Sequence, residues 1–322
     1  MEENWTEKGY AEEDCERRLE EKLAYQKYVK STCSRLGWAL TALLLISMGV
    51  GLIFNYFELD AVPEPVVTIL GYLAAAPSVF LLLREVPAVK QERKKMRFRK
   101  FLMFFVLVQG FGYIFNIAGN LLNAAVAAGM GRNPLNMNPV NDMLARLDWL
   151  MILYIAVLGP LVEEYIFRWV LLNRLRPFGE KAAILFSALM FGLLHGNLTQ
   201  FLYATAIGII FGYVAVKTGR MVYNCLLHIL VNSGSTLLAL SLQGSVFWQM
   251  VLSAGTALAM VGYIAAALVI FCLKVRKTRL APGAWPDGVE YRDFAAAMYL
   301  NPGVLSFVIL SLIMMGLYLF VV

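Results

Sequence analysis

Nine long apolar stretches divide this sequence, and they constrain its fold more than any other feature. Of the 322 residues, 60% are hydrophobic and 16% are charged, whereas about a quarter are charged in a soluble globular domain. A helix of roughly 20 apolar residues crosses a bilayer, and in lipid its backbone groups must bond within the segment. The sequence therefore predicts an all-α fold, a polytopic transmembrane helix bundle of about eight or nine spans. The stretches are 36–57, 66–83, 101–126, 149–172, 182–196 (a short one), 198–216, 221–242, 246–273 and 304–322.

Basic residues between the stretches predict how the chain is threaded through the membrane. The loop 84–100 carries eight Lys or Arg residues, and such loops stay on the cytoplasmic side. Threading from this loop gives a cytoplasmic N-terminus, and the general style of the sequence suggests a bacterial cell membrane. The net charge of +6 is then explained by topology and by attraction to the lipid bilayer, not by nucleic acid binding.

The chain divides into two unequal parts. Residues 1–35 hold nine acids and seven bases, and we expect a charged cytoplasmic segment that leads as a polar helix into the first span. Residues 36–322 are expected to form one integral membrane domain. Within it, the Asn- and Pro-rich segment 131–148 is predicted to be an irregular outer loop. The segment 278–303, which contains Pro, Gly and aromatic residues, is predicted to rest at the cytoplasmic interface.

Three ionisable residues in the fourth stretch indicate a functional site, because charge at membrane depth is costly. In the sequence GPLVEEYIFRW, Glu164 and Arg168 are four apart and share a helix face, so they can pair. Glu163 points about 100° away. We expect Arg168 to hold Glu164 ionised while Glu163 faces a cavity. The alternative is a buried charge network that serves packing alone.

Two further helices carry polar pairs at the same spacing. Phe191 and His195 are four apart in the fifth stretch, and His228 and Asn232 are four apart in the seventh. A single histidine on an apolar helix is usually a hydrogen-bonded core residue, but polar clusters on three helices favour a common site. The third stretch carries polar residues that either line the same cavity or bond between helices: Gln109, Asn116, Asn120 and Asn123.

These groups fit the hydrolysis of an acyl bond by two routes. Glu163, His195 and His228 could hold a divalent metal such as zinc, with a water in the open position. Without metal, Glu163 could deprotonate a water while a histidine and Asn232 hydrogen-bond the oxyanion. The sequence has no HExxH motif, so the spacing alone leaves both routes open.

The ordered motifs EExxxR, FxxxH and HxxxN resemble those of the CPBP family of intramembrane proteases, grouped with CAAX prenyl endopeptidases and Abi proteins. All three motifs fall within a core of about 149–240. The resemblance implies that Glu163 activates water, that His195 and His228 hold or polarise the reacting centre, and that Asn232 stabilises the oxyanion. The family is commonly called metalloprotease. The supporting residues that the resemblance implies are Glu164, Arg168 and Phe191.

The leading hypothesis is an intramembrane endopeptidase that cuts a membrane-tethered, in some cases prenylated, protein or peptide with a glutamate-activated water. Two alternatives are a non-enzymatic peptide-binding or immunity scaffold and an ion- or proton-coupled transporter. One difficulty is geometric. At 1.5 Å per residue, His195 lies roughly 21 Å and His228 about 11 Å from the cytoplasmic ends of their spans, so a shared site needs a tilted or displaced fifth helix.

Overall fold

The computed structural model describes residues 3–59, 61–132, 148–241 and 244–320. Helices are the only regular secondary structure in these ranges, and eight of them are long and apolar enough to cross a membrane. The predicted all-α polytopic membrane bundle is therefore confirmed. The long helices are α1 (Glu3–Tyr56), α2 (Glu64–Leu83), α3 (Phe98–Gly129), α9 (Leu198–Thr218), α10 (Met221–Ser241), α11 (Val246–Lys274) and α13 (Pro302–Phe320).

The fourth span is the eighth long helix, and it is built from several short segments. They are α5 (Trp149–Leu153), η2 (Tyr154–Leu158), α6 (Gly159–Glu164), η3 (Tyr165–Leu171), α7 (Leu172–Leu175) and η4 (Arg176–Phe178). The remaining elements are α8 (Glu180–Leu194), η5 (Val275–Lys277) and α12 (Tyr291–Tyr299). The sequence predicted one regular helix over 149–172. The structure instead has several segments there, and the interruptions lie next to the candidate site.

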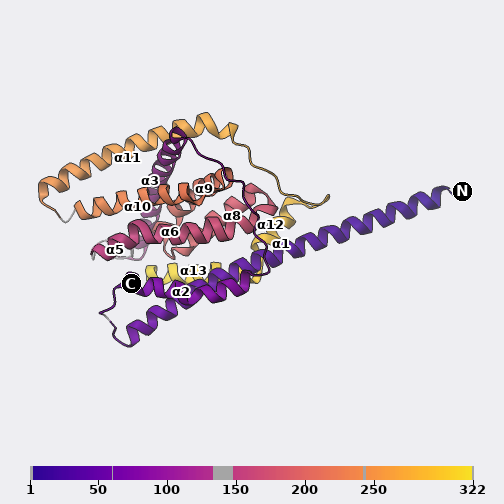
Figure 1. The fold of residues 1–322 in the computed structure, drawn as a ribbon, viewed down its shortest axis with the longest axis horizontal. Helices are drawn as coiled ribbons and strands as arrows, with labels where there is room; N and C mark the ends of the chain where they lie inside the picture. The colour runs from indigo at the N-terminus through magenta and orange to yellow at the C-terminus, as the bar shows by residue number, and fades with distance from the viewer. Residues whose placement is uncertain (1–2, 60, 133–147, 242–243, 321–322) are drawn as a thin grey trace.

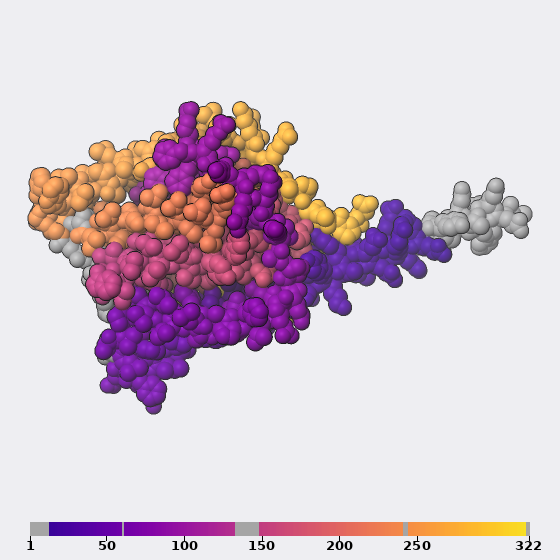
Figure 2. Space-filling model, in the orientation of Figure 1, coloured from indigo at the N-terminus to yellow at the C-terminus, as the bar shows by residue number. Residues whose placement is uncertain are grey.

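The charged N-terminal segment and the first span form one continuous helix of 54 residues. Its N-terminal end, before the contacts with α12 begin, projects away from the other helices (Figure 1, Figure 2). A salt bridge of 3.1 Å joins Lys22 of α1 to Asp293 of α12. The predicted interfacial segment 278–303 thus contains a short helix, against which Trp285 stacks on Phe294 at 4.4 Å. Most of the predicted outer loop, residues 133–147, lies outside the described residues.

Contacts between helix ends follow the predicted threading. The N–H of Lys94 donates to the carbonyl oxygen of Thr218 at 2.7 Å, so α9 ends beside the basic loop. Lys217 pairs with Glu180 at 2.5 Å, which brings the start of α8 to the same end. With 15 residues, α8 is shorter than the eight long helices and is not among the helices long enough to span a membrane, but it packs antiparallel to α9.

Small residues let α8 and α9 approach closely. A side-chain carbon added at Gly208 would lie 3.2 Å from Ala188, and one at Gly212 would lie 3.1 Å from Ile184. The turn that follows α9 depends on Gly219, whose φ of +59° is the left-handed conformation that glycine adopts readily. Its N–H bonds to the carbonyl of Ala215 at 2.8 Å. The hairpin therefore fixes α8 and the start of α10 relative to each other.

Candidate active site

The helix that carries Glu163 is irregular where it enters the site. Two π-helical segments, η2 and η3, flank α6. In η2 the N–H of Gly159 bonds to the carbonyl of Tyr154, five residues earlier. In this register the carbonyl of Ile155 would accept from residue 160, but Pro160 has no N–H to donate. The break therefore leaves one carbonyl without a backbone partner at the position where the span faces α10.

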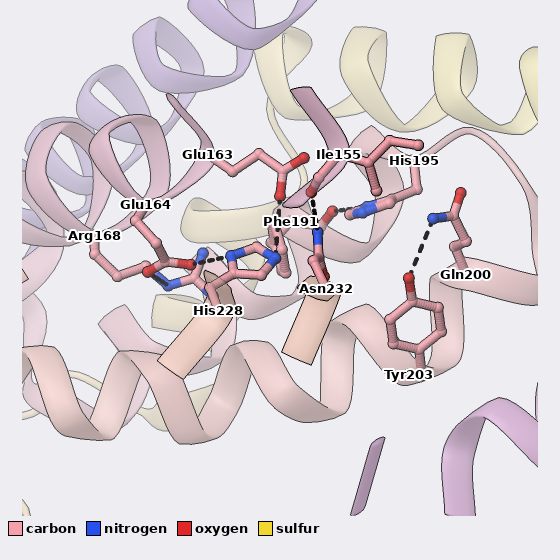
Figure 3. Close-up of polar contacts among 10 residues, drawn as sticks. All are labelled: Ile155, Glu163, Glu164, Arg168, Phe191, His195, Gln200, Tyr203, His228 and Asn232. Atoms are coloured by element: carbon pink, nitrogen blue, oxygen red, sulfur yellow. Dashed lines mark hydrogen bonds and ion pairs between the residues drawn. The ribbon is translucent and has the colours of Figure 1, made fainter. Parts of the chain in front are cut away.

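Asn232 of α10 supplies the missing donor. Its Nδ2 atom donates to the carbonyl oxygen of Ile155 at 3.0 Å (Figure 3). An amide nitrogen carries two hydrogens, so the second remains for another acceptor. Asn232 lies one turn after His228 on the same face of α10, and its bond to Ile155 ties that face to the fourth span.

A buried chain of charge links Arg168, Glu164 and His228. The Nε atom of Arg168 lies 3.3 Å from Oε2 of Glu164, and Oε1 of Glu164 lies 3.0 Å from Nδ1 of His228. An ionised carboxylate only accepts hydrogen bonds, so Nδ1 of His228 carries the hydrogen. Its Nε2 atom then points toward Glu163, whose Oε2 lies 3.6 Å away (Figure 3). Glu164 thus holds the imidazole in one orientation.

Aromatic rings surround the guanidinium of Arg168. Its central carbon lies 4.4 Å from the ring centre of Phe191, 5.3 Å from that of Phe211 and 5.9 Å from that of Phe167. Its nitrogens form no hydrogen bond within the described part of the chain. The positive charge is therefore balanced by Glu164 and by the negative faces of three rings.

His195 follows the last turn of α8 and is held by that turn. Its Nδ1 atom lies 2.9 Å from the carbonyl oxygen of Phe191. A carbonyl can only accept, so Nδ1 carries the hydrogen, and in the neutral ring Nε2 is an acceptor. The side chain of Asn197 donates to the carbonyl of His195 at 2.9 Å. Hydrogen bonds thus hold both the imidazole ring and the backbone carbonyl of His195.

Phe191 lies between the two histidines. Its ring centre is 5.1 Å from that of His195 and 5.8 Å from that of His228, edge to face in both cases. Both histidines therefore contact the same ring and line the same cavity, so they share a site despite their different distances from the ends of their spans.

Glu163, His195, His228 and Asn232 line one cavity of about 230 Å³. Glu164 does not line it. The side chain of Glu163 is 21% exposed, while that of Glu164 is fully buried. The two neighbouring carboxylates are thus separated as the helix-face argument expects, one toward the cavity and one toward Arg168.

Other polar residues of this cavity were not singled out from the sequence. Tyr72 of α2 and Tyr154 of η2 line it. Gln200 and Tyr203 also line it, and Nε2 of Gln200 donates to the hydroxyl of Tyr203 at 3.2 Å. Tyrosine is common in membrane helices, so a tyrosine in an apolar stretch does not by itself indicate a functional site. Gln200 lies in the first turn of α9, where polar residues are usual.

A neighbouring cavity of about 310 Å³ meets the first at Asn232 and Tyr203. Gln109 and Asn116 of α3 line this second cavity. Asn120, in contrast, donates to the carbonyl of Asn116 at 2.9 Å within α3. Neither expected role is therefore seen for these three residues: Gln109 and Asn116 line the adjacent cavity, and Asn120 bonds within its own helix and not to another one.

A metal requires several ligand atoms converging on one point. Among the described residues, no group of three or more His, Cys, Asp or Glu side chains is arranged to hold a metal ion. Nδ1 of His195 and Nδ1 of His228 are engaged by Phe191 and Glu164. These bonds orient the two rings and leave Nε2 of each histidine for other partners, and Glu163, His195 and His228 share the cavity.

Comparison with known proteins connects this site to a family. The family model described as "Type II CAAX prenyl endopeptidase Rce1-like" matches residues 145–234, which include all three motifs. The chain is 26% identical over 172 residues to the Bacillus subtilis (strain 168) protein named "Putative membrane peptidase YdiL", and the match covers 52% of this chain and 68% of the relative. No solved structure matches.

Proposed function

With its resemblance to the CPBP family of membrane proteases confirmed, we propose that this chain is an intramembrane endopeptidase. It hydrolyses a peptide bond of a membrane-tethered protein or peptide with a water activated by Glu163. The observation that carries this proposal is the single cavity that Glu163 shares with His195, His228 and Asn232. A carboxylate base, imidazoles and an amide donor at one buried point are the groups that acyl hydrolysis requires.

Glu163 and His195 orient the attacking water. The water donates one hydrogen to the carboxylate of Glu163 and the other to Nε2 of His195, which is an acceptor because Nδ1 is bonded to Phe191. A lone pair of the water oxygen is then directed at the carbonyl carbon. As the bond to carbon forms, Glu163 takes the proton.

His228 and Asn232 stabilise the oxyanion that results. Nε2 of His228 lies 3.6 Å from the Glu163 carboxylate and points toward it (Figure 3). In the proposed mechanism this nitrogen carries a hydrogen and donates it to the oxyanion. The second amide hydrogen of Asn232 is the other donor. Such preorganised donors are worth about 10²- to 10³-fold each.

Collapse of the tetrahedral intermediate releases the products. The bond between carbon and nitrogen breaks, and Glu163 returns its proton to the leaving amine, so that a carboxylic acid and an amine are formed. Glu163 is then ready for a second water.

The position of the cavity supports a membrane-tethered substrate. Its lining residues come from α1, α2, η2, α6, α8, α9 and α10, most of which belong to helices long and apolar enough to cross a membrane. A substrate with a lipid anchor, such as a prenylated peptide, or with a membrane segment, would be concentrated there. We therefore include CAAX-type prenylated peptides among the substrates proposed.

The test is cleavage of a farnesylated CAAX peptide and its unprenylated form by purified protein in liposomes, with products identified by mass spectrometry. We expect Glu163→Gln to reduce the rate by about 10²- to 10⁴-fold, the range typical of a lost general base. The matched control is Glu58→Gln, which removes the same charge from an exposed turn and should leave the rate unchanged.

Two further measurements separate the alternatives. Peptide binding should survive in Glu163→Gln, because the substitution removes the base and not the cavity. Binding without cleavage by the wild-type protein would favour the scaffold, and cleavage that Glu163→Gln leaves intact would overturn the mechanism. A parallel assay with a chelator tests for a metal directly.

A further inference from the structure

A larger cavity, of about 490 Å³, lies between α3, α8, α9 and α11, away from the active site. It shares no lining residue with the active-site cavity. Its walls are apolar side chains of all four helices, among them Leu107, Ile184, Ile210 and Phe271. Nothing in the proposed peptidase mechanism uses this space.

Four lysines line one end of this cavity: Lys100, Lys181, Lys274 and Lys277. All four are exposed. None of them makes a salt bridge with a carboxylate among the residues that the structure describes. They come from the start of α3, the start of α8 and the end of α11 with η5, so they lie at the membrane end that carries the basic loop 84–100.

The nearest acid along the chain does not neutralise this group. Glu180 precedes Lys181, but its carboxylate pairs with Lys217 at 2.5 Å and with Arg176 at 3.5 Å. It also accepts a hydrogen bond from the backbone N–H of Ala281 at 2.9 Å. Four positive charges therefore remain at the mouth of an apolar slot.

We propose that this cavity is a binding site for an anionic phospholipid of the leaflet at this end. The lysines place a phosphate at the mouth. Because Lys100 precedes Leu107 by two turns of α3, the slot below the phosphate is roughly 10 Å deep at about 1.5 Å per residue, which suits the upper part of an acyl chain. Basic pockets between membrane helices bind anionic headgroups in this way. A neutral isoprenoid would fill the slot but would leave the lysines without a counter-charge.

The test counts lipids bound to the purified full-length chain by native mass spectrometry during titration with dioleoylphosphatidylglycerol or dioleoylphosphatidylcholine. We expect the wild-type protein to bind the anionic lipid at least about tenfold more tightly. Replacing the four lysines, as Lys100→Gln, Lys181→Gln, Lys274→Gln and Lys277→Gln together, should abolish that preference.

The matched control removes the same charge from exposed lysines at the same end of the molecule. In it, Lys27, Lys30, Lys90 and Lys95 are each replaced by Gln, and the lipid preference should remain. A second variant, Leu185→Trp, fills the slot but keeps the lysines, and it should weaken binding of the intact lipid. Glycerol phosphate, which lacks acyl chains, should not compete.

Three results would overturn the proposal. The first is equal loss of preference in both lysine variants, which would indicate general charge attraction. The second is full binding of the lipid by Leu185→Trp or competition by glycerol phosphate, since either result would show that the acyl chain does not need the slot. The third is displacement of bound lipid by a neutral farnesylated peptide, which would assign the slot to the substrate.

Discussion

At the scale of single residues, the site depends on how buried charge is compensated. Arg168 and Glu164 are both almost completely buried, and His228 completes the group through Glu164. Breaking a buried pair by removing one partner is far more costly than losing a surface pair, because the remaining charge has no water around it. Glu164 and Arg168 are therefore positioning residues whose loss should act on stability first.

The first prediction concerns Arg168→Met. It leaves Glu164 buried without its cation, and we expect a loss of about 3–5 kcal/mol in the free energy of unfolding. Denaturant titration of the detergent-solubilised protein measures this. The double variant Arg168→Met with Glu164→Gln removes both charges and should recover part of the loss.

Arg35→Met provides the comparison. Arg35 pairs with Glu85 at 2.6 Å, but both side chains are exposed, at 39% and 57%. An exposed pair of this kind is worth about 0–1 kcal/mol. Equal losses in Arg168→Met and Arg35→Met would show that the buried pair has no special cost.

At the scale of secondary-structure elements, the fourth span is the distinctive one. Its π-helical register and Pro160 together leave the carbonyl of Ile155 to be satisfied by Asn232. Asn232 therefore has a structural role in addition to the proposed role at the oxyanion. The two roles can be separated, because only the first depends on what residue 160 can donate.

The second prediction is that Pro160→Ala relieves the structural role of Asn232. Alanine restores an N–H that can bond to Ile155, so the stability cost of Asn232→Ala, about 1–3 kcal/mol for an unsatisfied buried group, should shrink in that background. The loss of cleavage rate should persist, because the oxyanion donor is still absent. Unfolding titrations and rates on the four variants of the cycle measure both effects.

Pro77→Ala is the control for this cycle, since Pro77 lies inside α2. In that background the stability cost of Asn232→Ala should be unchanged. If the stability cost of Asn232→Ala were the same with and without Pro160→Ala, the N–H of residue 160 would not replace Asn232 as donor to the carbonyl of Ile155, and the prediction would be wrong.

Helical spacing was sufficient to predict several of these relationships. Residues four apart predicted the pairing of Glu164 with Arg168 and the shared face of His228 and Asn232. The bond from Asn232 to Ile155 could not be predicted, because hydropathy does not distinguish an α-helical from a π-helical register. Tyr72, from a helix far from the motifs in sequence, was also missed, because only tertiary packing brings it to the cavity.

At the scale of the whole molecule, helix-end contacts and loop charge give one consistent threading. Gly303, at the start of α13, donates to Oγ of Ser34 at 3.1 Å, and α9 ends beside Lys94. At the opposite end, Arg132 after α3 donates to the carbonyl of Leu319 near the end of α13 at 3.4 Å. Hydropathy was sufficient to predict these crossings, whereas the orientation rests on the charges of the loops, the basic loop 84–100 above all.

The third prediction tests that orientation with a membrane-impermeant maleimide. One variant keeps Cys15 as its only thiol, with Cys33, Cys225 and Cys272 replaced by alanine. A second replaces Cys15 as well and carries Glu58→Cys in the turn after α1. Because positively charged loops are retained in the cytoplasm, Cys15 should react in inverted vesicles and the cysteine introduced by Glu58→Cys in intact cells. Reaction of Cys15 from outside intact cells would reverse the orientation and place the four-lysine cavity in the outer leaflet.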